Sequence, residues 1–168
     1  MINIRAERPQ DYNQVYEVVK QAFAGAEHTN GDEQNLVNRL RRSEAYIPEL
    51  SLVAEQEGKI VGHIMFTRLK AGNTVQLGLA PLSVLPSYQN QGIGSRLIEA
   101  GHQIARELGY EFSIVVGHAA YYPRFGYLPA AGFGIKAPFD VPPECFMAIN
   151  LQGKKTRLNA VVEYSAEF

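Results

Sequence analysis

The chain has 168 residues, with 16 basic and 17 acidic side chains and a formal net charge of −1 at pH 7. This length is sufficient to bury a substantial core, and the usual domain size predicts a single domain over residues 1–168. The near balance of charge, without a dense run of Lys or Arg, excludes the composition of a nucleic-acid-binding or membrane-surface protein.

The N-terminal residues predict a strand. Apolar and polar residues alternate over residues 2–6, and Pro9 ends the pattern. The same stretch lacks the apolar core of a signal peptide, and no apolar run in the chain is long enough to span a membrane. We therefore expect a cytoplasmic protein with no membrane partner.

Two amphipathic helices are predicted next. The first covers residues 12–24 and the second residues 33–42, each with apolar residues at helical spacing. Asp11 and Asp32 stand immediately before them, and aspartate is a favoured N-cap residue. We expect both side chains to cap their helices.

Three antiparallel strands follow. Residues 51–55 and 59–68 read as the arms of a hairpin that turns at Glu57-Gly58. A third arm begins after the turn at residues 71–73.

The third arm contains a change of phase. Apolar residues occupy odd positions between Val75 and Leu79, but Leu82 and Val84 are at even positions, with Pro81 between the two sets. One extra residue and a proline that cannot donate to the ladder are the signs of a β-bulge.

A glycine-opened helix follows this strand. Gly92 and Gly94 precede a helical pattern that Gly109 ends. The predicted buried face consists of Ile93, Leu97, Ile104, Ala105 and Leu108. A helix start without side chains exposes unpaired N–H groups at its positive dipole end, so an anion can come within hydrogen-bonding distance. We predict a phosphate or pyrophosphate site there.

The spacing around the glycines narrows the class of site. No Gly-Lys-Ser/Thr follows, as a P-loop requires, and no third glycine completes a dinucleotide fingerprint. What remains is Gln89-x-x-Gly92-x-Gly94 directly after a Leu-x-Val-x-Pro strand. This resembles the acyl-CoA signature of the GNAT superfamily of N-acetyltransferases, whose (Arg/Gln)-x-x-Gly-x-(Gly/Ala) loop holds the CoA pyrophosphate.

The resemblance implies a mixed α/β (α+β) fold, with a central mixed sheet, two splayed parallel strands and flanking helices. It implies acetyl-CoA as the cosubstrate, with the pantetheine arm lying between the splayed strands against backbone groups of Leu82 and Val84. The implied cofactor-binding residues are Leu82, Ser83, Val84, Gln89, Asn90, Gln91, Gly92, Ile93, Gly94, Ser95 and Arg96. Arg124 is either a further phosphate contact or, as we prefer, a solvated cation.

A β-branched run at residues 112–116 predicts a strand buried on both faces, which completes a βαβ unit with the helix before it. The ligand should lie at the carboxyl ends of the two parallel strands. The segment that follows resembles the GNAT pattern Tyr-x-x-x-Gly-(Phe/Tyr), and aligning Gly126-Tyr127 selects Tyr122. A tyrosine of ordinary pKa, about 10, is protonated at neutral pH, so Tyr122 is our candidate proton donor to the departing thiolate.

The general base is less clear from the sequence. Many GNAT enzymes carry a carboxylate on the bulged strand, but residues 75–81 contain none. We place Glu33 and His118 first as catalytic candidates, because acceptor sites in this fold lie between the first helices and the splayed strands. The other candidates are Glu27, His28 and His63, and a water chain is left open.

The C-terminal part predicts a strand at residues 146–151, a turn at residues 153–155 and strand character over residues 158–164. The last segment is either an added strand or a homodimer contact. We expect Cys145 to be a passive half-buried thiol. The single cysteine excludes a disulfide framework, and no two histidines have a ligand spacing, so we predict no metal site.

Two functions follow from these residues. The first is an acetyl-CoA-dependent N-acetyltransferase that acts on a primary amine of a small molecule or a protein by direct attack. The alternative is a non-catalytic sensor that binds CoA or an acyl-CoA, which the missing strand carboxylate supports.

Overall fold

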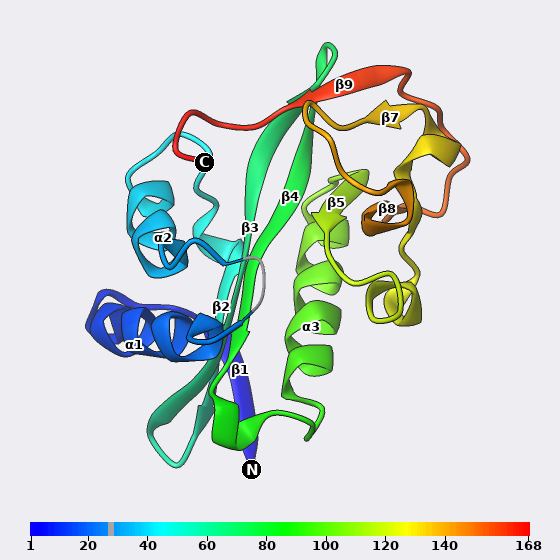
Figure 1. Cartoon of the computed structure of the whole chain (residues 1–168). Coiled ribbons are helices and arrows are strands. Elements are labelled where there is room, and N and C mark those ends of the chain that lie inside the picture. The colour runs from blue at the N-terminus through cyan, green and yellow to red at the C-terminus, as the bar shows by residue number, and fades with distance from the viewer. Residues whose placement is uncertain (27–28) are drawn as a thin grey trace.

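A mixed sheet with helices on both faces forms the centre of the computed structural model, which describes residues 1–26 and 29–168 (Figure 1). The strands are β1 (Ile2–Ala6), β2 (Ser51–Gln56), β3 (Lys59–Ala71), β4 (Thr74–Val84), β5 (Phe112–Val116), β6 (Leu128–Pro129), β7 (Ile135–Lys136), β8 (Phe146–Asn150) and β9 (Ala160–Glu163). The α-helices are α1 (Tyr12–Phe23), α2 (Glu33–Arg41) and α3 (Ile93–Glu107). The main strand order is β1-β2-β3-β4-β5-β8-β6, and only β4 and β5 are parallel neighbours along it. The predicted mixed α/β class is confirmed.

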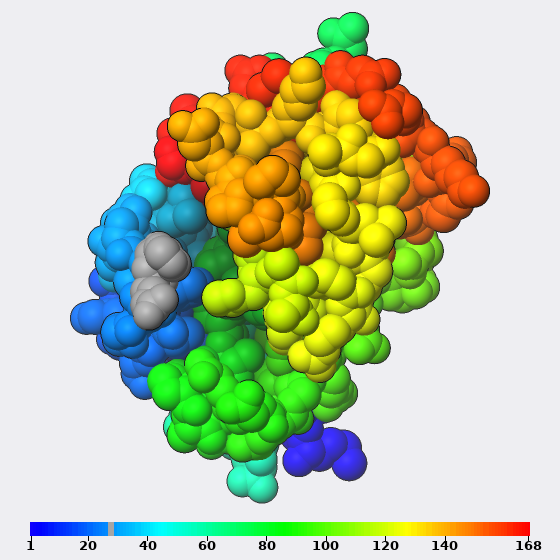
Figure 2. Space-filling view, turned by 45° about the vertical axis from the view of Figure 1, so that its right-hand side comes forward, coloured from blue at the N-terminus to red at the C-terminus, as the bar shows by residue number. Residues whose placement is uncertain are grey.

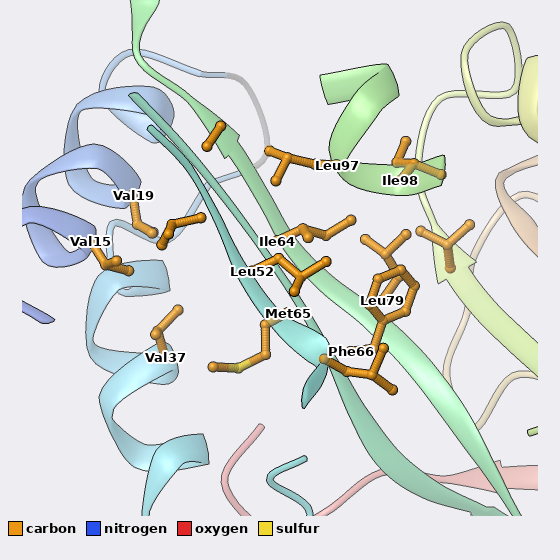
Figure 3. Close-up of a cluster of buried hydrophobic side chains, with 14 of the residues drawn as sticks. Val15, Val19, Val37, Leu52, Ile64, Met65, Phe66, Leu79, Leu97 and Ile98 are labelled. Atoms are coloured by element: carbon orange, nitrogen blue, oxygen red, sulfur yellow. The ribbon is translucent and has the colours of Figure 1, made fainter. Parts of the chain in front are cut away.

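The core lies on both faces of the sheet. In Figure 3, Val15, Val19 and Val37 extend from α1 and α2 toward one face, while Leu97 and Ile98 of α3 face the sheet from the other side. All five side chains are buried. Each contributes about 1.5–3 kcal/mol by leaving water, so the two helical layers fix the strands between them.

Both predicted caps stand at the N-cap position, but neither side chain accepts a hydrogen bond from a backbone N–H of its helix. Asp11 precedes α1, yet its carboxylate accepts hydrogen bonds from the Arg5 guanidinium (2.7 and 3.0 Å) and the Arg8 backbone N–H (2.7 Å). The Asp32 carboxylate accepts from the Asn35 side chain (3.0 Å) instead of a backbone N–H of α2. The capping prediction is therefore wrong for both side chains, because charged or amide partners nearby take their oxygens.

The central hairpin has the predicted turn. Glu57 and Gly58 both have positive φ values, 51° and 79°, as the tight two-residue turn of a twisted hairpin requires. The strands extend further than predicted, to Gln56 and to Ala71. Ala71 begins the next turn, so β2, β3 and β4 form one continuous antiparallel unit.

The predicted β-bulge in β4 is confirmed. Phe66 of β3 pairs with Leu79, whereas Ile64 pairs with Leu82, so two residues of β4 lie opposite one residue of β3. Of the apolar residues at odd positions in β4, Leu77 and Leu79 are buried and Val75 is exposed. Val75 stands next to the turn between β3 and β4, which projects beyond the rest of the sheet (Figure 1).

The two parallel strands separate after a short contact. β4 and β5 pair only at Leu77 with Ser113 and at Gly78 with Ile114. The bulge follows immediately, and the rest of β4 runs without β5 beside it. The predicted splay is therefore present, and it leaves a gap in the sheet at the carboxyl ends of both strands.

Helix α3 buries most of the predicted face, because Ile93, Leu97 and Ala105 are buried and Ile104 packs partly buried against the core. Leu108 is exposed, whereas Gly101 and His102 are buried. A Cβ at Gly101 would clash with the Phe66 ring, so only glycine lets α3 pack this closely. A search for apolar residues could not have found this contact, because neither glycine nor histidine carries the apolar signal.

The C-terminal segment adds a strand to the sheet. β9 pairs with the end of β3 at Lys70 and Ala71 and with β7, as one of the two sequence alternatives predicts. The strand predicted at residues 146–151 is β8, and Cys145 before it is half-buried, as expected.

Three buried polar side chains form a hydrogen-bonded chain between α3 and β5. The His102 Nε2 atom is 3.0 Å from the Tyr127 hydroxyl oxygen, which in turn is 2.7 Å from Ser113 Oγ. Burial, with a smaller contribution from the charge of Arg106, lowers the pKa of His102 from 6.5 to about 4. His102 is therefore neutral in the folded protein at pH 7.

This depressed pKa predicts a loss of stability in acid. Because the unfolded chain binds the proton first, the contribution is complete above pH 6.5 and is lost as the pH falls toward about 4, which amounts to about 3 kcal/mol. His102→Gln, whose amide can still reach the Tyr127 hydroxyl, should lose that much less free energy of unfolding between pH 7 and pH 4. Urea titrations at the two pH values measure this. Equal acid losses in the variant and the parent would contradict it.

Candidate active site

A cavity of about 900 Å³ lies where the end of β4, the loop before α3 and the segment after β5 meet. Figure 2 shows the green loop and helix start around residues 86–96 below the yellow-green segment that follows β5, with a hollow between them. The cavity is lined by Leu82, Val84, Tyr88, Gln89, Asn90, Gly92, Ile93, Gly94, Ser95, His118, Tyr121, Tyr122 and Arg124.

The two glycines of the loop serve different purposes. Gly92 has φ 82° at the N-cap of α3, a backbone conformation that other residues rarely adopt, although a Cβ there would meet nothing within 4 Å. A Cβ at Gly94 would lie 2.8 Å from the Tyr121 hydroxyl and would project into the cavity lining. Gly92 is needed for the turn, and Gly94 is needed to keep the space open.

The start of α3 offers hydrogen-bond donors to the cavity. The first backbone bond of the helix joins the Arg96 N–H to the Gly92 carbonyl (3.1 Å), so the N–H groups of residues 93–95 precede the helical ladder. None of the residues named as lining the cavity is acidic, and Arg124 is positively charged. The site therefore suits a multiply charged anion such as a diphosphate.

The edge of β4 faces the gap with its backbone. The Leu85 N–H donates to the Val61 carbonyl of β3 (2.9 Å). Because successive residues of a strand direct their backbone groups to opposite sides, those of Val84 point away from β3, toward the gap. The Val84 carbonyl accepts a hydrogen bond from Gln89 Nε2 (3.1 Å), which ties the loop to the strand.

The structure brings eight of the eleven predicted cofactor-binding residues to the cavity: Leu82, Val84, Gln89, Asn90, Gly92, Ile93, Gly94 and Ser95. Three others are not part of its lining. Ser83 is buried and pairs with His63 of β3, Gln91 hydrogen-bonds the Ser87 carbonyl (3.4 Å), and Arg96 is exposed on α3. Ser83 does not line the cavity because neighbouring residues of a strand direct their side chains to opposite faces of the sheet, and Leu82 and Val84 face the cavity.

Tyr122 lies in the same cavity as His118. Its ring packs against Gly117, where a Cβ would clash with it, and edge-on against Tyr127 at 5.6 Å between ring centroids. Burial, with a smaller effect of Tyr121, raises the pKa of Tyr122 well above its usual range. The hydroxyl is therefore held in its protonated form.

Neither Glu33 nor His63 lines this cavity. Both oxygens of Glu33 accept from Thr29 Oγ1 (2.6 and 2.8 Å). His63 is fully buried 3.0 Å from Ser51 Oγ, and burial lowers its pKa to about 4 against the opposing effect of Glu7. Glu27 and His28 lie outside the described residues.

Two lining residues were missed by sequence reasoning. Tyr88 ends a short 3₁₀ turn, Pro86–Tyr88, and Pro86 at the start of this turn is the signal in the sequence that could have indicated it. The GNAT-like pattern selects Tyr122, but the Tyr121 and Tyr122 rings meet edge to face at 5.1 Å and both line the cavity.

Within residues 1–26 and 29–168, no cluster of three or more His, Cys, Asp or Glu side chains is placed to hold a metal ion. None of the helices in the same ranges combines the length and the apolar character needed to cross a membrane.

Comparisons with known proteins agree with this geometry. A family model described as an acetyltransferase (GNAT) domain matches residues 48–129. The chain is 40% identical over 156 residues to YjhQ of Escherichia coli strain K12, described as an uncharacterized N-acetyltransferase, with 88% of this chain and 83% of that protein covered.

Two solved structures are similar over nearly the whole chain. A GNAT family acetyltransferase from Brucella melitensis in complex with acetyl-CoA has 33% identity and a TM-score of 0.85, covering 100% of this chain and 98% of the other. YhbS of Escherichia coli, a GNAT family N-acetyltransferase in complex with CoA, has 27% identity and a TM-score of 0.90, covering 99% and 91%.

Proposed function

The chain belongs to the GNAT family of N-acetyltransferases, and from this we propose that it transfers the acetyl group of acetyl-CoA to a primary amine by direct attack. The observation that carries the proposal is the cavity at the glycine-opened start of α3, beside the gap between β4 and β5. Relatives crystallised with acetyl-CoA and with CoA support the choice of cosubstrate.

In this proposal the diphosphate of acetyl-CoA binds the N–H groups of residues 93–95, and the Ser95 hydroxyl adds a further donor. The pantetheine arm lies along the free edge of β4, between the side chains of Leu82 and Val84. The open space at Gly94 supports this placement, because any side chain there would occupy the cradle. Arg124 stands at the same cavity and adds positive charge.

Three groups of this chain then assist the reaction. Acetyl-CoA supplies a thioester carbonyl, and the Val84 N–H, directed into the gap, stabilises the negative charge that develops on its oxygen. Tyr122 gives its proton to the departing sulfur, since its raised pKa keeps it protonated until then. His118, in the same cavity, accepts the proton that the amine loses.

Release of free thiol tests the activity. The protein is incubated with acetyl-CoA and a panel of small amines and amino-terminal peptides, and free CoA is followed against the rate without amine. An acetyltransferase releases thiol above hydrolysis with at least one amine. Retained CoA binding without such release would instead favour the non-catalytic sensor.

A further inference from the structure

A second cavity, of about 210 Å³, lies at the point where β4 and β5 separate. It is lined by Gly78, Leu79, Ala80, Ile114, Val116, Phe139, Tyr164 and Phe168. Gly78 and Ile114 are also the last residues at which the two parallel strands pair. The second cavity therefore begins at the same gap in the sheet as the first.

The two cavities lie on opposite faces of the sheet. A Cβ at Gly94 of α3 would be 3.9 Å from the side chains of Leu82 and Val84, so the first cavity is on the α3 face. A Cβ at Gly78 would instead meet the side chains of Leu69 and Tyr164, at 3.0 and 3.7 Å.

Neighbouring side chains of β5 are also divided between the two faces of the sheet. Val115 belongs to the core cluster that includes α3, whereas Ile114 belongs to a separate cluster with Leu69 and Val162. Figure 1 shows the red segment after β9 crossing β3 and β4 toward α2, where Arg39 Nε donates to the Glu167 carbonyl (3.1 Å). This anchored segment forms the outer wall of the second cavity.

We propose that the second cavity binds the acceptor and that the acceptor is a small aromatic amine. This inference rests on the proposed function, because an acyl group held in the first cavity reaches the gap from one face. The opposite face is then the side from which an amine can approach its carbonyl.

The lining selects for an aromatic group. The Phe139 and Tyr164 rings stack with an interplanar angle of 19° and 5.9 Å between centroids, and Phe168 lies 5.2 Å from Tyr164. Phe139 and Val116 are nearly half exposed, 48% and 45%, although both are large and apolar. A planar ring between them gains aromatic contacts and covers exposed apolar surface.

The lining also selects against a charged amine. None of its eight side chains carries a charge at neutral pH, and burial raises the pKa of Tyr164, the only titratable side chain among them, to about 12. An alkylammonium ion would lose hydration there without gaining a side-chain carboxylate among the lining residues. An aryl amine is neutral at pH 7, because its lone pair is delocalised into the ring.

A neutral acceptor also accounts for the catalytic groups that line the first cavity. No Asp or Glu side chain lines either cavity in the described part of the chain, so neither lining offers a side-chain carboxylate to deprotonate an ammonium before attack. The aryl nitrogen forms the N–C bond with its own lone pair, and the C–S bond breaks with its electron pair going to sulfur. Tyr122 protonates the sulfur, and His118 accepts the proton from nitrogen.

Three amines of similar size test the effects of aromatic character and of charge separately. Aniline is aromatic and neutral, benzylamine is aromatic and cationic, and cyclohexylamine is non-aromatic and cationic. Thiol release at pH 7 should give aniline a kcat/KM at least about tenfold above that of cyclohexylamine, with benzylamine between them. A preference for cyclohexylamine would overturn the inference.

A substitution in the lining tests whether the acceptor binds in the second cavity. Phe139→Ala should raise the KM for aniline about tenfold and leave the Kd for acetyl-CoA unchanged. Leu128→Ala is the matched control, because Leu128 is similarly exposed (56% against 48%) and lines neither cavity. An unchanged KM for aniline in Phe139→Ala would contradict the site.

The outcomes also distinguish this inference from the proposed function. Acetylation of alkyl or peptide amines without acetylation of aniline overturns the aromatic acceptor and leaves the acetyltransferase in place. No thiol release with any amine overturns both.

Discussion

Gly94→Val should weaken acetyl-CoA binding by about 100-fold or more. The new side chain would project into the cradle at the start of α3, where only the Tyr121 hydroxyl lies closer than 3 Å to a Cβ built on Gly94. Losing two charge-assisted hydrogen bonds between backbone N–H groups and a diphosphate costs about 3 kcal/mol or more, which corresponds to that change in Kd. Isothermal titration with acetyl-CoA measures it.

Two controls separate a blocked cradle from a disturbed fold. Gly132→Ala changes a glycine that has open space around it and lies outside the cavity, so the Kd should not change. Gly94→Val combined with Tyr121→Phe removes the hydroxyl contact but keeps the obstruction. If the double variant binds acetyl-CoA as the parent does, the single variant acted only through Tyr121, and the cradle is refuted.

Tyr122→Phe should lower kcat about 100- to 1000-fold while the Kd for acetyl-CoA stays within about twofold of the parent. General acid catalysis contributes a factor of this size, and the substitution removes only the hydroxyl from a well-packed ring. Because burial raises the pKa of Tyr122, the parent should show no loss of kcat between pH 7 and pH 9 from this group. Steady-state kinetics across that range check both expectations.

Substitutions at Tyr121 and Glu33 serve as controls for Tyr122→Phe. Tyr121→Phe alters a tyrosine of the same cavity whose hydroxyl lies at Gly94, so its effect should appear in the Kd for acetyl-CoA more than in kcat. Glu33→Gln should leave both nearly unchanged, because the Glu33 carboxylate binds Thr29 outside the cavity lining. A normal kcat in Tyr122→Phe would dismiss the acid role.

Local sequence patterns predicted the strand, loop and helix start that line the first cavity. The bulge in β4 is visible as a phase change around Pro81, and the loop is visible as two glycines before a helical pattern. Each depends on residues close together in the chain, so backbone preferences alone restrict the structure. Ser83 belongs to the same continuous stretch but does not line the cavity, because neighbouring strand residues direct their side chains to opposite faces.

Features that depend on distant segments could not be predicted in the same way. The acidic residues before α1 and α2 are typical caps, but Asp11 accepts hydrogen bonds from Arg5, whose guanidinium also donates to Glu55 of the neighbouring strand β2. The second cavity joins β4 and β5 to Phe139 and Tyr164, which no sequence spacing relates. The burial of Gly101 likewise follows from where Phe66 lies across the sheet.

A crystal structure of the protein with acetyl-CoA tests the central claim most directly. The account predicts diphosphate oxygens within hydrogen-bonding distance of the N–H groups of residues 93–95, with the pantetheine arm beside Leu82 and Val84 and the acetyl group at the gap between β4 and β5. A diphosphate bound elsewhere, or an arm that lies outside a closed gap, would contradict it.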